Sequence, residues 1–134
     1  MRLVLDASAA LYALSAADHG TGLLGPHQLV APALLWSEVT AELHAAVIRR
    51  EITADAATAA LDALDLAGVD RFAALHLHRR AWDVAERLGW GRTYDAEYVA
   101  LAELLEIPLL TLDARLARGA SRLISVLGPC DLPT

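Results

Sequence analysis

Short apolar runs alternate with helical repeats along this chain of 134 residues. Consecutive apolar residues are typical of strands buried on both faces of a sheet, whereas apolar residues that recur every three or four positions indicate helices. The apolar runs predict strands over residues 3–5, 29–31, 72–77, 107–112 and 123–127. The helical repeats predict helices over residues 9–17, 34–50, 54–67, 78–88 and 94–105, with a short helix within 18–27 and another that begins within 113–117.

Capping residues mark several of these helix boundaries. Thr53 and Thr93 stand where a side-chain oxygen would cap the helix that follows, and Gly68 and Gly89 stand where a helix would end. The strand–helix alternation, with connections long enough for parallel crossovers, predicts an α/β fold. We expect a three-layer sandwich in which helices flank a central parallel sheet, formed by a single domain over residues 1–134.

Hydrophobic residues make up 56% of the chain, which raises the question of a membrane span. No uncharged apolar run reaches the length of about 18 residues that a spanning helix needs, and the amino terminus is already strand-like. We therefore expect a soluble protein without a targeting peptide and without a membrane partner. The single cysteine, Cys130, excludes an internal disulfide and a thiolate zinc cluster, and it fits a reducing cytoplasmic location.

The chain contains neither lysine nor asparagine, and all 11 of its basic residues are arginines. A GC-rich genome explains this bias without any appeal to function. The bias nevertheless excludes phosphate-binding loops with an essential lysine, Schiff-base chemistry and Ser–Lys nucleophilic pairs. The formal charge of −6 argues against a purely electrostatic nucleic-acid binder, but not against an enzyme whose carboxylates hold cations.

Four acidic residues from separate segments are predicted to meet at one edge of the sheet. Asp6 and Asp113 directly follow two predicted strands, Asp95 lies in the first turn of a helix, and Glu38 lies near the start of another. Ligands of open parallel sheets bind beyond the carboxyl ends of the strands, where these acids are expected. Taken singly, each acid has an ordinary structural explanation: a turn for Asp6, helix caps for Asp95 and Asp113, and a solvated surface for Glu38.

Converging carboxylates need cations or protons. Two unit charges about 5 Å apart at an effective dielectric constant of about 20 repel by roughly 3 kcal/mol, and several such pairs would rival the stability of a whole domain. Carboxylate oxygens prefer Mg²⁺ or Mn²⁺ to zinc. Such ions, held by carboxylates, are a common means of phosphodiester hydrolysis. The pattern therefore predicts a Mg²⁺ site, at which Mn²⁺ can substitute, in a phosphodiester hydrolase.

Four segments of the chain resemble, in the same order, the motifs of the PIN domain family and especially of its VapC-like members. These segments are 3–11 (LVLDASAAL), 31–39 (APALLWSEV), 93–103 (TYDAEYVALAE) and 110–116 (LTLDARL). The resemblance implies a PIN-like fold, a Mg²⁺ or Mn²⁺ site and endonucleolytic cleavage of RNA. It also implies that the protein is the toxin of a toxin–antitoxin pair, neutralised by a small antitoxin and commonly a homodimer.

By position, the family's catalytic and metal-binding quartet corresponds to four residues of this chain: Asp6, Glu38, Asp95 and Asp113. The resemblance gives the hydroxyls of Ser8 and Thr111 a supporting role. It departs at Ala41, where the family often has asparagine, which removes a contact around the metal ligands but none of the ligands themselves. Glu42 lies one helical turn after Glu38, so it is either a second acidic support for the site or a solvated residue.

Some residues outside the quartet could also carry chemistry. His76 and His78 alternate at a predicted strand end and are more often structural than metal-binding when no acid is near in sequence. Trp90 and Arg92 precede Asp95 and could stack on a base and bind a phosphate, or simply form a surface loop with a packed indole. A sparse basic run could follow RNA or solvate a helix; its members are Arg115, Arg118 and Arg122.

Two other classes of function compete with the nuclease interpretation. An aspartate-nucleophile phosphatase or a receiver domain would need a later lysine, and the phosphatase would also need an aspartate at position 8, where the chain has serine. A catalytically silent PIN-like module that binds RNA or protein is the second alternative. The presence of all four acids argues against that module, and a metal-dependent cleavage assay would distinguish the two.

Overall fold

The computed structural model describes residues 1–15 and 25–132 of the chain. Within these residues five parallel strands form one sheet in the order β3-β2-β1-β4-β5. The strands are β1 (Arg2–Leu5), β2 (Gln28–Ala31), β3 (Asp70–Arg71), β4 (Leu109–Leu110) and β5 (Val126–Leu127). In β1, the central strand, Leu3, Val4 and Leu5 have no exposed surface. Burial on both faces explains why this strand is a continuous apolar run.

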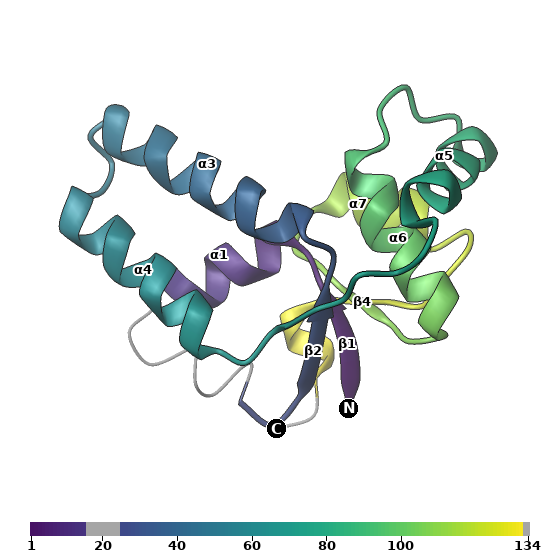
Figure 1. The fold of residues 1–134 in the computed structure, drawn as a ribbon, viewed down its shortest axis with the longest axis horizontal. Helices are drawn as coiled ribbons and strands as arrows, with labels where there is room; N and C mark the ends of the chain where they lie inside the picture. The colour runs from purple at the N-terminus through teal and green to yellow at the C-terminus, as the bar shows by residue number, and fades with distance from the viewer. Residues whose placement is uncertain (16–24, 133–134) are drawn as a thin grey trace.

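Two groups of helices enclose the sheet (Figure 1). One group consists of α1 (Ala7–Ser15), α3 (Leu34–Ile48) and α4 (Ala54–Leu66), which pack on one another. The other consists of α5 (Leu77–Leu88), α6 (Tyr94–Leu105) and α7 (Ala114–Ala120), and α6 packs on β1 and β4. A short 3₁₀ helix, η1 (Pro129–Asp131), follows β5. The arrangement confirms the predicted α/β sandwich with a parallel sheet between helices.

The register of the sheet brings the ends of its two central strands together. Leu5 of β1 pairs with Leu110 of β4, so the residues that follow, Asp6 and Thr111, leave neighbouring strands at the same edge. The helices α1, α3 and α7 begin on this side, because each follows the carboxyl end of a strand. No helix in the described part of the chain is long and apolar enough to cross a membrane.

The predicted strand over residues 72–77 is wrong. Only Asp70 and Arg71 pair with β2, after which the backbone amide of Phe72 donates one more hydrogen bond, of 2.9 Å, to the carbonyl of Ala31. The sheet ends there because β2 itself ends at Ala31. His76 adopts a left-handed conformation (φ 61°), and α5 starts at the next residue. Consequently His76 and His78 do not alternate across a strand.

Other element boundaries differ less. The strands β4 and β5 are shorter than the predicted runs, and the short helix predicted within 18–27 lies mostly outside the described residues. Thr53 does cap α4, accepting a hydrogen bond of 3.1 Å from the amide of Ala56. Gly89 ends α5 with φ 71°, as predicted. Thr93 occupies the position before α6, but its side chain makes no capping bond, so that prediction is wrong.

Candidate active site

The four predicted acids come from four elements that meet at the carboxyl edge of the sheet. Asp6 follows β1, Glu38 is on α3, Asp95 is in the first turn of α6 and Asp113 follows β4. Their charges act on one another: Asp113 raises the pKa of Asp6 and of Asp95, while Asp6 and Asp95 raise the pKa of Glu38. The structure thus brings all four carboxylates into one electrostatic cluster.

Asp6 is the buried centre of this cluster, with 3% of its surface exposed. Its Oδ1 accepts hydrogen bonds from the Ala9 amide (2.9 Å) and the Ser8 hydroxyl (2.8 Å), and its Oδ2 accepts one from the Thr111 hydroxyl (2.5 Å). Burial raises the pKa of Asp6 above its ordinary value, although these three hydrogen bonds oppose the rise. Three donors fill three of the roughly four acceptor positions of a carboxylate, which leaves about one for a cation.

The hydroxyls of Ser8 and Thr111 are themselves oriented by the backbone. The Leu112 amide donates to Ser8 Oγ at 3.0 Å, and the Asp113 amide donates to Thr111 Oγ1 at 3.0 Å. With the backbone occupying an acceptor position on each oxygen, each hydroxyl can direct its proton toward Asp6. These contacts tie the loop after β4 to the loop after β1 and hold the Asp6 carboxylate in one orientation.

Glu38 is held by Tyr98, a residue to which the sequence analysis gave no role. The Tyr98 hydroxyl donates a hydrogen bond of 2.5 Å to Glu38 Oε1, and only 1% of Tyr98 is exposed. Burial is the largest cause of the raised pKa of Glu38, which the bond from Tyr98 opposes. Tyr98 lies three residues after Asp95 on α6, so the helical repeat places both on one face. This spacing is the feature of the sequence that could have pointed to Tyr98.

Asp95 and Asp113 keep oxygens available. Asp113 caps α7, and both capping bonds, from the amides of Arg115 (2.9 Å) and Leu116 (3.1 Å), end on Oδ1. Its Oδ2 therefore has no donor among the described residues. The carboxylate of Asp95 accepts no hydrogen bond there either; partial withdrawal from water and then Asp113 raise its pKa, while Arg115 lowers it. The helix-cap explanation of Asp113 is correct, and it leaves one oxygen of the side chain unused.

Comparisons with known proteins identify the family to which the chain belongs. The family model described as PIN domain matches residues 3–121. The chain is 40% identical over 119 residues to Ribonuclease VapC1 of Mycobacterium tuberculosis, an alignment that covers 85% of this chain and 87% of the relative. It is also 36% identical over 115 residues to VapC ribonuclease Mb0985 of Mycobacterium bovis, covering 86% and 88% of the two chains.

The chain belongs to the PIN domain family. Among solved structures, PAE2754 from Pyrobaculum aerophilum superimposes on this PIN domain with a TM-score of 0.72 at 23% identity, covering 96% of this chain and 90% of that one. This likeness bears on the fold alone. Together the matches confirm the resemblance stated from the four motifs, including its VapC-like character.

A pocket of about 580 Å³ opens onto three of the four acids of this PIN domain; the fourth, the buried Asp6, is not part of its lining. Basic and aromatic residues join the acids in its wall: Trp90, Arg92, Tyr94 and Arg115. The exposed guanidinium groups of Arg92 and Arg115 form no hydrogen bond or ion pair within the described residues, so both can bind a phosphate. An anionic substrate would therefore meet arginines at the rim of a carboxylate site.

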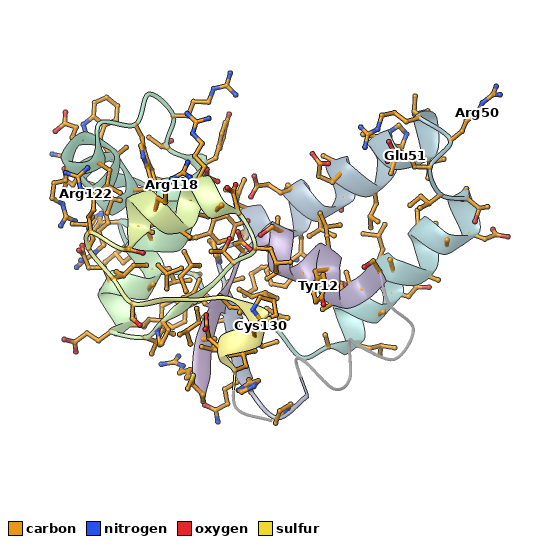
Figure 2. All side chains as sticks on the ribbon, turned by 180° about the vertical axis from the view of Figure 1, so that it is seen from behind. Tyr12, Arg50, Glu51, Arg118, Arg122 and Cys130 are labelled. Atoms are coloured by element: carbon orange, nitrogen blue, oxygen red, sulfur yellow. The ribbon has the colours of Figure 1, made fainter. Side chains whose placement is uncertain are left out.

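The indole of Trp90 is packed rather than free. It is half-buried, and it lies so close to Gly119 of α7 that a Cβ added there would stand 2.5 Å from its Cζ2. The interpretation of Trp90 as a packed indole is therefore correct, while the same residue also lines the pocket. Arg118 in the last turn of α7 and Arg122 just after that helix lie on the half of the molecule built by α5–α7, away from Arg50 and Glu51 at the opposite end (Figure 2).

The donor set of the PIN site fits a hard divalent cation. Its charged ligand candidates are all carboxylates, and the structure contains no histidine or cysteine among them. As the side chains stand, no three His, Cys, Asp or Glu residues of the described chain are close enough together to hold an ion. Asp95 and Oδ2 of Asp113 are free of hydrogen bonds, so rotation of these two side chains could bring oxygens to an ion beside Asp6. With Asp95 and Asp113 rotated in this way, the chemistry of the site fits Mg²⁺ or Mn²⁺.

Two other candidates lie apart from the four acids. Glu42 is exposed, does not line the pocket, and acts electrostatically on Arg49 of its own hairpin. His78 lies 3.6 Å from Glu97 of α6, a partner that the sequence analysis did not anticipate because it is far along the chain. Glu97 is buried, and burial raises its pKa. His76 belongs to no group of metal-binding side chains among the residues described here.

Proposed function

We propose that this chain is a divalent-metal-dependent endoribonuclease that acts as the toxin of a toxin–antitoxin pair. The observation that carries the proposal is the convergence of three further carboxylates on the buried Asp6, beside a pocket lined by arginines. The similarity to VapC ribonucleases supports RNA as the substrate. We assign the metal-binding and catalytic roles to Asp6, Glu38, Asp95 and Asp113, with Mg²⁺ as the ion and Mn²⁺ as its substitute.

The protein's own groups divide the work of the reaction. Ser8 and Thr111 hold the Asp6 carboxylate, and Tyr98 holds that of Glu38, so two acids are fixed before substrate binds. Arg92 and Arg115 bind the RNA phosphates at the rim of the pocket. A divalent ion held by these carboxylates would lower the pKa of the attacking water and offset the negative charge that develops on the phosphate.

Paired substitutions on α3 test the site. Cleavage of a structured RNA should require Mg²⁺ or Mn²⁺ and stop with EDTA. Glu38→Gln should abolish cleavage, whereas the same substitution one turn later, Glu42→Gln, should change it little, because Glu42 does not line the pocket. Cleavage that survives exhaustive chelation would exclude the metal mechanism. An inactive Glu42→Gln beside an active Glu38→Gln would show that the wrong turn of the helix has been assigned to the site.

Toxicity requires a separate test, because a catalytically silent binding module is the alternative function. Induced expression should arrest bacterial growth, and Asp6→Asn should relieve the arrest at equal protein level. Arrest that persists with soluble Asp6→Asn would favour the binding module. The complete acid set, with Asp6 held by three hydrogen bonds, favours the nuclease.

We also propose a small antitoxin partner, a homodimer and a cytoplasmic location. The motif resemblance to VapC-like toxins is the ground for the antitoxin and the dimer, and solved structures of similar fold include VapBC-1 from nontypeable Haemophilus influenzae. The free, exposed Cys130 fits a reducing compartment. Co-expression with a short neighbouring open reading frame that encodes a DNA-binding protein should yield a stable complex without toxicity. Light scattering of the purified protein would measure the oligomeric state.

A further inference from the structure

A further pocket, of about 650 Å³, adjoins the acidic site. The two pockets share helices α3 and α6: Ser37 lines this pocket and Glu38 the acidic one, while Glu97 lines this pocket and Asp95 the acidic one. Residues two apart on a helix point in nearly opposite directions, so the first turn of α6 separates the pockets. Glu97 nevertheless acts electrostatically on Glu38 of the acidic pocket, so an RNA strand bound at the acidic site can place a neighbouring nucleotide in this space around that turn.

Glu97 is the one acidic residue in the lining of this pocket. Only 9% of the residue is exposed, and its single charged partner is His78, whose own side chain is 89% exposed. The Glu97 carboxylate accepts no hydrogen bond from any described residue, so both oxygens retain acceptor capacity toward the pocket. The Glu97 oxygens are not sealed among the buried atoms that lack a partner, so a ligand with donor groups could reach them from the pocket.

The rest of the lining suits a nucleotide. Apolar surface from Leu34, Phe72, Ala74 and Leu77 can pack against the flat faces of a base, and the half-buried Phe72 adds an aromatic ring. The exposed side chain of Arg79 lines the same pocket and can bind a phosphate. The pocket thus combines apolar surface, a cationic side chain and an acidic acceptor, which suit a base, a phosphate and the donors of a base edge.

We propose that this pocket binds the base next to the scissile phosphate and that Glu97 selects guanine there. This inference rests on the proposed ribonuclease function, since the pocket is assigned through its position beside the cleavage site. An ionised carboxylate is an acceptor only, with two parallel oxygens. On its Watson–Crick edge guanine alone presents two adjacent donors, N1–H and the N2 amino group. Adenine and cytosine present one donor beside an acceptor, and uracil presents one donor between two acceptors.

Sequencing of cleavage products from a single-stranded RNA library tests the assignment. The wild-type protein should cut with guanine enriched at one fixed position beside the cut. Glu97→Gln should lower kcat/KM on guanine sites by about 10–100-fold, the range that a bidentate contact to a base supports. Its rate on adenine and cytosine sites should hold or rise, because an amide offers one donor and one acceptor. Glu86→Gln, which removes one exposed charge from α5, is the matched control and should retain the guanine preference.

A binding measurement separates this inference from the proposed function. NMR titration of the metal-free protein with guanosine and adenosine 5′-monophosphates should show tighter guanosine binding, weakened at least 10-fold by Glu97→Gln. Guanosine binding by a protein that cleaves no RNA would overturn the proposed ribonuclease function but support the assignment of the pocket to guanine. Three results would overturn the assignment of the pocket to guanine. They are wild-type cleavage without guanine preference, an equal loss of cleavage rate at all four bases in Glu97→Gln, and an unchanged guanine preference in Glu97→Gln. A changed oligomeric state with unchanged base preference would identify it as a protein contact instead.

Discussion

Tyr98 on α6 donates a hydrogen bond of 2.5 Å to Glu38 on α3, across the line where the two helical groups meet. The phenol is buried, so water cannot replace it as the donor. A charged acceptor that loses such a donor is left without a partner in a partly dry environment, which destabilises the folded state. The orientation of Glu38 therefore depends on a buried residue that does not line the pocket.

Tyr98→Phe should preserve the shape of the core while removing this donor. We expect a fall in kcat of about 10–100-fold at saturating Mg²⁺, the usual cost when a group that orients a metal ligand is lost. Stability should fall by about 1–3 kcal/mol. A double-mutant cycle with Glu38→Ala, measured by urea unfolding, isolates the pair. If Tyr98→Phe cleaves RNA at the wild-type rate, the bond has no part in orienting the catalytic acid.

Asp113 has two roles that different substitutions separate. Asparagine keeps a capping oxygen for α7, whereas alanine removes it and should cost about 0.5–2 kcal/mol. Both variants should lose cleavage, because both lack the anionic oxygen that faces the pocket. Thermal melts with EDTA should place Asp113→Asn at or above the wild type and Asp113→Ala below it. Normal cleavage by Asp113→Asn would leave Asp113 as a helix cap alone.

Asp95 has no capping role, so the melting temperature of an Asp95 variant reports directly on the repulsion among the carboxylates of the site. Asp95→Asn removes one of the mutually repelling charges and should melt at an equal or higher temperature than the wild type without metal. Saturating Mg²⁺ should reverse the order, since a ligand at 100 times its dissociation constant adds about 2.7 kcal/mol to the protein that binds it. Clear destabilisation of metal-free Asp95→Asn would contradict the repulsion that the site implies.

The stability of the metal-free protein should depend on pH in a defined direction. Burial raises the pKa of Asp6, Glu38 and Asp95 above their ordinary values of 3.8, 4.5 and 3.8. Between each raised value and its ordinary value, the folded state binds more protons than the unfolded state. The contribution of these groups to stability therefore increases as the pH falls through that window and becomes constant below it.

Chemical denaturation from pH 7 to pH 4 in EDTA checks this dependence. As the pH falls, the free energy of unfolding of the wild type should rise relative to that of Asp95→Asn, which lacks the Asp95 carboxyl. The difference between these two free energies should therefore narrow. In saturating Mg²⁺ the trend should reverse, because protons compete with the ion for the same oxygens. A difference between wild type and Asp95→Asn that stays constant with pH would mean that Asp95 titrates normally in the folded protein.

Gly119 should be the least replaceable glycine near the site. A Cβ there would stand 2.5 Å from the Trp90 indole, so Gly119→Ala must displace a ring that lines the pocket. We expect a loss of about 1–3 kcal/mol, typical of overpacking, together with slower cleavage. Gly91→Ala is the control, because Gly91 lines the same pocket and a Cβ there would meet nothing within 4 Å. Equal melting temperatures for the two variants would show that the indole moves aside without cost.

The sequence predicted the elements whose pattern reflects their own burial. β1 is an uninterrupted apolar run, so its position and the acid that follows it could be located from the chain alone. The same holds for β4 and Asp113, although only Leu109 and Leu110 form the strand. Convergence of the acids then followed from one rule, that parallel strands present their carboxyl ends at a common edge.

The edge strand could not be predicted in this way. In β3 the paired residues are Asp70 and Arg71, both polar and exposed, whereas the apolar residues after them cover a pocket instead of joining the sheet. The length of β3 depends on where its neighbour β2 ends, and the local sequence of β3 does not contain that information. The contacts Tyr98–Glu38 and His78–Glu97 were missed for the same reason, since each depends on how two helices dock.

The hydroxyl of Thr111 reaches back to a carboxylate 105 residues earlier. During synthesis, a ribosome-bound chain that has exposed β1, β2 and α3 still lacks β4, the strand on the other side of β1, and the Thr111 hydroxyl that helps to orient Asp6. Loop closure over such a separation is slow compared with the formation of local helices. We therefore expect the nascent chain to be unable to cleave RNA until the last third of the chain has folded onto the first strand.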